Sequence, residues 1–178
     1  MTGTTGSGGL LGGGLVPRHQ LAERDMLLAY LQRQRELVQW KCGGLDDAAA
    51  RAQGTPTGLT IHGIVAHLTG VERGWIREHF AGEPRQRVRD EEFAPQQGSL
   101  ADLLAAYRLE TERCDEVISR AALDDVSALR DHSLRWILLH LVEEIGRHLG
   151  HLDLLCEQAD GRTGEEPEGA PPPGVDEA

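Results

Sequence analysis

The sequence has few aromatic residues and few cysteines. The first shortage limits what can form the core, and the second excludes a protein held together by disulfides. Aromatic residues make up only 4% of the 178 residues, so aliphatic side chains must form most of any core. The three cysteines, Cys42, Cys114 and Cys156, are far apart and form no C-x-x-C motif. Such sparse cysteines exclude a disulfide framework and indicate a reducing compartment. We therefore expect a cytoplasmic protein whose cysteines are small packing residues.

Positive charge is also scarce. The formal net charge is −11, and no stripe of lysine or arginine stands out from the acidic background, which argues against a nucleic-acid partner. No apolar run approaches the length of a membrane span. The glycine-rich start lacks the basic and apolar regions of a signal peptide. We expect neither nucleic acid nor a membrane as a partner.

Composition divides the chain into a body and two tails. Residues 1–17 are rich in glycine and are predicted to be disordered. Residues 161–178 are acidic and rich in proline, with the same prediction. Between them, residues 18–160 are long enough for one domain with a real core.

The body shows helical patterns and no strand pattern. Apolar residues recur at three- and four-residue steps in four stretches, which predict helices over residues 18–41, 60–80, 99–120 and 133–157. A short helical turn is expected at 47–51, and residues 81–98 form a long polar loop of a kind that often covers a site. The fold class is therefore all-α, a four-helix bundle.

The last predicted helix carries the most informative polar residues. At about 100° per residue, its apolar residues form one face; they are Leu134, Ile137, Leu138, Leu141, Ile145, Leu152 and Leu155. His148 falls inside this face, Glu144 and His151 fall on its rim, and Glu143 falls on the opposite, solvent side. A buried imidazole and carboxylate need partners, because burying them alone costs several kcal/mol.

Glu144 and His148 are four residues apart, which places them one turn apart on one helix face. They can bind one metal ion, or they can simply pair with each other. In the second predicted helix, His67 lies at the edge of the apolar face, whereas His62 is expected to face solvent. A histidine like His67 is often a hydrogen-bonded core residue. Nearby glycines, Gly70 among them, leave room beside it for backbone or ligand.

Three segments of the chain resemble one known family. They are Trp40–Asp46, Leu59–Trp75 with its His67-Leu68 pair, and Ser133–His151. Together they resemble the DinB-like superfamily of metal-binding four-helix bundles, and within it the actinobacterial mini-circle protein branch. The resemblance covers about residues 23–163.

The resemblance implies an up-down-down-up bundle that binds a divalent ion, usually zinc or nickel. The ligands it implies are His67, Glu144 and His148. Many members have H-x-x-x-H-R-G-Q on the last helix, and Glu144 replaces the first histidine here. A carboxylate at that position matches the thiol-dependent maleylpyruvate isomerase relatives. His151 falls at the glutamine position, beside the ligands rather than among them, while His79 and His140 are neighbours without a firm role.

The same resemblance implies a function. We expect a low-molecular-weight-thiol S-transferase or isomerase, with a thiol such as mycothiol as cofactor and an electrophilic small molecule as substrate. The alternative is a non-catalytic metal-binding, stress-related bundle that forms a homodimer. A third reading is a plain helical bundle in which Glu144 and His148 pair with each other.

Overall fold

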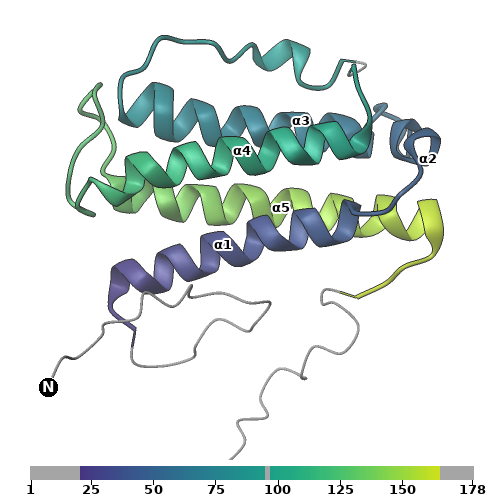
Figure 1. Cartoon of the computed structure of the whole chain (residues 1–178), viewed down its shortest axis with the longest axis horizontal. Coiled ribbons are helices and arrows are strands. Elements are labelled where there is room, and N and C mark those ends of the chain that lie inside the picture. The colour runs from purple at the N-terminus through teal and green to yellow at the C-terminus, as the bar shows by residue number, and fades with distance from the viewer. Residues whose placement is uncertain (1–20, 95–96, 165–178) are drawn as a thin grey trace, which may run out of the picture.

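The computed structural model describes residues 21–94 and 97–164, which fold into helices (Figure 1). The long helices of this part are α1 (Glu23–Cys42), α3 (Ile61–Glu72) with its π-helical continuation η1 (Arg73–Phe80), α4 (Leu100–Ser119) and α5 (Leu134–Asp160). Two short elements, α2 (Asp47–Arg51) and the 3₁₀ turn η2 (Arg89–Glu91), lie in the connections. Among the described residues, the only extended pairing is an isolated bridge between Val126 and Ser133. The all-α prediction is confirmed.

The helices begin where side chains can cap them. Thr60, Ser99 and Ser133 each accept a hydrogen bond from a backbone N–H of the first turn that follows, which satisfies a donor that the helix itself cannot pair. Asp102 completes a reciprocal capping box with Ser99. At the other end of α1, Gly44 adopts a φ of 77°, a conformation that favours glycine.

The core is aliphatic, as the composition predicts. The apolar face predicted for α5 is buried, with no side chain on it more than 5% exposed. This face packs against α1 and α3, while α3 also packs against α4. All three cysteines are free and buried, which confirms their role as packing residues. None of the described helices is both long and apolar enough to cross a membrane.

One charged pair is buried within this core. Arg35 of α1 donates two hydrogen bonds to the carboxylate of Glu72 on α3, at 2.7 and 2.8 Å. Glu72 is fully buried and Arg35 is 4% exposed. Such a pair holds two helices in one register, because separating the charges inside the protein is strongly unfavourable.

The expectation that His62 faces solvent is wrong. The side chain of His62 is 2% exposed, and its Nε2 lies 3.5 Å from Asp47 Oδ1. The helical wheel treats the side of a helix opposite its apolar face as open. Here α2 covers that side of α3, and Asp47 also accepts a hydrogen bond from the backbone N–H of Leu100, which brings the start of α4 against it.

The second long helix changes its winding at Arg73. Its last two turns are π-helical, closed by a hydrogen bond from the N–H of Ala81 to the carbonyl of Ile76 at 3.0 Å. A π-helix turns less per residue than an α-helix. Side chains beyond Arg73, His79 among them, therefore leave the directions that the wheel assigns to them.

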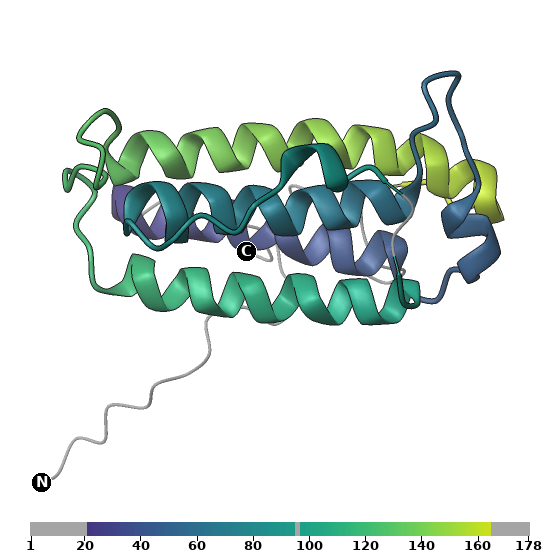
Figure 2. The ribbon, with the colours of Figure 1, turned by 90° about the horizontal axis from the view of Figure 1, so that it is seen from above.

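Residues 81–94 run back along the outside of α3 (Figures 1 and 2). This is the long polar loop that the sequence predicts, and it forms one wall of the site described below. The predicted tails lie mostly outside the described residues, so their disorder stays a prediction.

Candidate metal centre

The structure brings together the three residues predicted to bind a metal. His67 projects from α3, and Glu144 and His148 project from successive turns of α5, so two neighbouring helices supply the cluster. Glu144 Oε1 lies 3.4 Å from His67 Nε2 and 3.6 Å from His148 Nε2. The two imidazole rings are 4.5 Å apart between centroids. The three donor atoms all lie within 4.8 Å of one another.

These distances suit a shared ion better than direct hydrogen bonds. A good N–H···O bond is about 2.7–3.2 Å long, and both contacts of Glu144 exceed that. Two ligands of a tetrahedral zinc ion, each about 2.0–2.2 Å from the metal, are about 3.3–3.5 Å apart. The contacts at 3.4 and 3.6 Å are close to that spacing. The two contacts of Glu144 therefore have the spacing that a shared zinc-like ion requires.

Burial and the contacts within the cluster together give its residues the protonation states that a metal needs. Burial, with the neighbouring His67 ring, lowers the pKa of His148 to about 4, so at neutral pH the ring is the neutral form that binds metals. Burial alone raises the pKa of Glu144, but the contacts with His67 and His148 outweigh it and hold that pKa below its usual value. An ionised carboxylate and a neutral imidazole are the ligand forms that a divalent ion needs.

His148 also lacks an alternative partner. Its side chain is only 12% exposed, and its buried Nδ1 has no hydrogen-bond partner among the residues that the structure describes. The contact of its Nε2 with Glu144, at 3.6 Å, is too long for a hydrogen bond. A buried nitrogen without a partner is unfavourable, whereas Nε2, which faces Glu144, is the nitrogen placed to bind an ion.

Glu92 and Arg87 support the cluster from residues 81–94. Glu92 Oε2 lies 2.7 Å from Nδ1 of His67, so a proton on Nδ1 leaves Nε2 free to face Glu144. Arg87 donates from Nε and Nη2 to the same carboxylate, at 2.6 and 3.1 Å. A carboxylate behind a histidine in this way fixes the ring and increases its strength as a metal ligand. Sequence reasoning missed both residues, because a polar loop carries no periodicity that would point to them.

Two glycines of the second long helix make room for this support. A Cβ atom at Gly70 would lie 2.1 Å from Glu92 Oε1, and one at Gly74 would lie 2.8 Å from Cδ of Arg87. Real Cβ atoms do not come that close to other heavy atoms. The expected space beside His67 exists at Gly70, but the side chains of the Arg87–Glu92 pair occupy it rather than backbone or a ligand.

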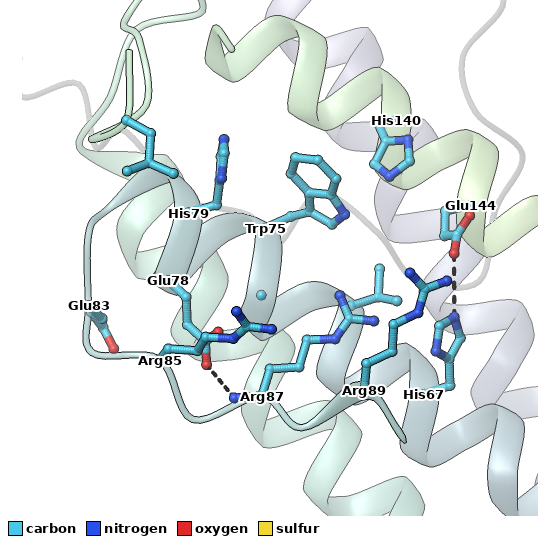
Figure 3. A pocket seen from close by; sticks show the side chains of 13 residues that line it. His67, Trp75, Glu78, His79, Glu83, Arg85, Arg87, Arg89, His140 and Glu144 are labelled. Atoms are coloured by element: carbon cyan, nitrogen blue, oxygen red, sulfur yellow. Dashed lines mark hydrogen bonds and ion pairs between the residues drawn. The ribbon is translucent and has the colours of Figure 1, made fainter. Parts of the chain in front are cut away.

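A cavity of about 580 Å³ opens beside the cluster, a size typical of small-molecule sites. His67 and Glu144 line one part of it, and Figure 3 shows Trp75 and His140 between these residues and His79. Trp75 and His140 pack edge to face with ring centroids 4.6 Å apart. His79 and His140, to which the sequence assigns no firm role, therefore line this cavity.

The other predicted residues lie outside the cluster. His151 is exposed, and its ring centroid is 5.5 Å from that of His148. Its place beside the ligands, rather than among them, stays a prediction. Glu143 is exposed and pairs with Arg147 one turn further on, which confirms the solvated position predicted for it.

A second cluster of metal-type side chains lies near the far wall of the cavity. His79 Nε2 and His132 Nδ1 lie 2.9 and 3.1 Å from Asp131 Oδ1, which also accepts a hydrogen bond from Ser127. The Ser127 hydrogen bond is the main reason why the pKa of Asp131 falls to about 2. These lengths are those of ordinary hydrogen bonds, and the Asp131 side chain is 47% exposed. We assign no metal to this cluster, because the carboxylate explains it without one.

Comparison with known proteins agrees with the motifs. The family model described as mycothiol-S-transferase matches residues 26–161, which is well over half of the chain and includes the whole cluster. Among curated proteins, no sequence matches this chain. The chain therefore belongs to the mycothiol-S-transferase family, within the DinB-like superfamily.

Proposed function

We propose that this protein is a metal-dependent S-transferase that joins a low-molecular-weight thiol of the mycothiol type to an electrophilic small molecule. The observation that carries the proposal is the position of the His67, Glu144 and His148 cluster at the edge of a 580 Å³ cavity. Two imidazoles and one carboxylate leave coordination positions open, as catalytic metal sites do and structural ones do not.

The chain's own residues define what the site can do. His67 and Glu144 line the cavity that would receive the thiol sulfur, and Glu92 holds the His67 ring in place from behind. Zinc or nickel bound there would lower the pKa of a bound thiol and make it a nucleophile near neutral pH. The thiol would release its proton to water. Its sulfur would form a bond to the electrophilic carbon, whose leaving group, chloride in 1-chloro-2,4-dinitrobenzene, would depart with the electrons of the bond that breaks. An isomerase would use the same first step and release the thiol again.

The cavity also bears on the non-catalytic alternative. A metal that only stabilises a bundle needs closed coordination and no adjoining space. Here His67 and Glu144 border a cavity with Trp75 and Val71 among its apolar walls. A site built this way favours a role that includes a small-molecule substrate.

The proposal extends to topology and location. The return of residues 81–94 along α3 supports the up-down-down-up helix order that the family implies. The three free cysteines support a place in the reducing cytoplasm.

The test is thiol-dependent loss of an electrophile in metal-loaded and metal-free protein. With 1-chloro-2,4-dinitrobenzene as a neutral electrophile and mycothiol as the thiol, we expect conjugate formation only in the metal-loaded protein. A His148→Ala variant should lose it as well. Conjugation at an undiminished rate by metal-free protein would overturn the proposal.

A further inference from the structure

Three arginines of residues 81–94 line the cavity. Arg85 and Arg87 alternate along an extended stretch, Arg89 begins the 3₁₀ turn η2, and all three are part of the cavity wall. Side chains two residues apart in an extended chain point the same way, with about 7 Å between them along the backbone. Figure 3 shows the three side chains in a row, with Arg85 toward His79 and Arg89 toward the His67–Glu144 end.

The stretch is fixed to the helices that hold the metal cluster. Glu78 on η1 accepts hydrogen bonds from the backbone N–H groups of Gln86 and Arg87, at 2.7 and 2.8 Å. The Arg87 side chain is bound to Glu92, which in turn contacts His67. The arginines therefore have a defined position relative to the donor atoms of the cluster.

Of the three arginines, only the central one has its charge paired by a residue that the structure describes. Arg87 is balanced by Glu92. For Arg85 and Arg89, the described part of the chain shows no hydrogen bond or ion pair to either side chain, although both line a cavity. The acidic residues of the cavity wall already have partners: Glu78 holds the backbone, Glu83 pairs with Arg77, and Glu144 contacts His67. Asp90 and Glu91, which follow Arg89, are not part of the wall.

We propose that Arg85 and Arg89 bind the carboxylate groups of the substrate, so that the molecule received by this cavity is a small organic acid. This inference rests on the proposed function and adds the class of its electrophile. The net charge of the protein is −11, yet these two guanidinium groups give this part of the cavity wall a positive charge. Guanidinium groups bind carboxylates through paired, charge-assisted hydrogen bonds. The apolar walls near Trp75 would hold the carbon chain, and the acid groups would set its position relative to the metal end of the cavity.

The test is direct binding of adipate, a linear dicarboxylate, measured by calorimetry with no thiol present. Dimethyl adipate, which has the same chain without charge, is the matched neutral probe. We expect adipate to bind and the ester to bind at least about tenfold more weakly. The double variant Arg85→Gln, Arg89→Gln should lose about tenfold in adipate affinity, with an unchanged melting temperature because both side chains are exposed.

Two controls separate this site from other sources of anion binding. The double variant Arg108→Gln, Arg120→Gln removes two exposed arginines of α4 and its C-terminal cap that are not in the cavity wall, and it should bind adipate like the unchanged protein. Measurements on metal-free protein exclude binding of the carboxylate to the ion. The loss of adipate affinity in the Arg85→Gln, Arg89→Gln variant should also be seen in metal-free protein. Equal affinity for adipate and its ester, or equal losses in the two double variants, would overturn the inference. Either result leaves thiol transfer to the neutral electrophile as a separate question.

Discussion

Replacing Gly70 by alanine should weaken metal binding without touching a metal ligand. The new Cβ would lie 2.1 Å from Oε1 and 2.8 Å from Cδ of Glu92, so the carboxylate must move. Its contact with Nδ1 of His67, 2.7 Å long, would then be lost. Removing such a supporting carboxylate typically reduces metal affinity by about 10- to 100-fold, which corresponds to about 1.4–2.7 kcal/mol.

The substitution should stabilise the helix while it weakens metal binding, so a loss of metal affinity cannot be attributed to unfolding of α3. Alanine is favoured over glycine inside a helix by about 1 kcal/mol, so Gly70→Ala should not unfold α3. Gly150→Ala on α5 is the matched control, because a Cβ there would meet no atom within 4 Å. It adds the same methyl group to a helix and should leave metal affinity unchanged.

Glu92→Gln provides an independent route to the same effect. The amide keeps the size of the side chain but loses the negative charge that faces His67 and Arg87. We expect a loss of about tenfold in zinc affinity, measured for all three variants by competition with a chromophoric chelator. If Gly70→Ala and Glu92→Gln both bind zinc within about twofold of the unchanged protein, the supporting role of Glu92 is refuted.

Three further predictions concern stability. Glu72→Ala removes the buried carboxylate that pairs with Arg35 and should lower the free energy of unfolding by about 3–5 kcal/mol in urea titrations. Asp115→Ala removes an exposed partner of the same arginine and should lower it by less than about 1 kcal/mol. Equal losses in the two variants would contradict this prediction. Burial lowers the pKa of His62 from its usual 6.5, so the unfolded chain binds more protons and the free energy of unfolding should fall as pH drops below 6.5. His62→Gln should lose less stability between pH 7.5 and 5.5 than the unchanged protein does. Parallel plots of stability against pH for the two proteins would refute this prediction. Removing the metal with a chelator should lower the melting temperature, since zinc at a hundredfold excess over its Kd stabilises the native state by about 2.7 kcal/mol. The same shift in a His67→Ala, His148→Ala variant would show that the ion binds elsewhere.

The helices were predictable because local signals agree with the packing. Ser99 and Ser133 cap the helices that the apolar periodicity predicts, and the apolar face of α5 is the face that lies in the core. The meeting of His67 with His148 also followed from their positions at the inner faces of two helices. Periodicity reports which side of a helix is buried, and here the site lies on that side.

The rest depended on contacts that periodicity does not encode. His62 is buried because the short helix α2 covers its side of α3, and a helical wheel contains no information about a neighbouring element. The π-helical turns after Arg73 change the direction of His79. Glu92 and Arg87 lie in a segment without regular structure, so only the folded chain reveals that they reach His67.

The proposed function requires that His67, Glu144 and His148 bind one divalent ion. The most direct measurement is elemental analysis of protein purified without a histidine tag, beside the His67→Ala, His148→Ala double variant. We predict about one zinc or nickel ion per chain in the unchanged protein, and its loss in the variant. The account is contradicted if the variant retains the ion, or if the unchanged protein holds none even after zinc or nickel is added.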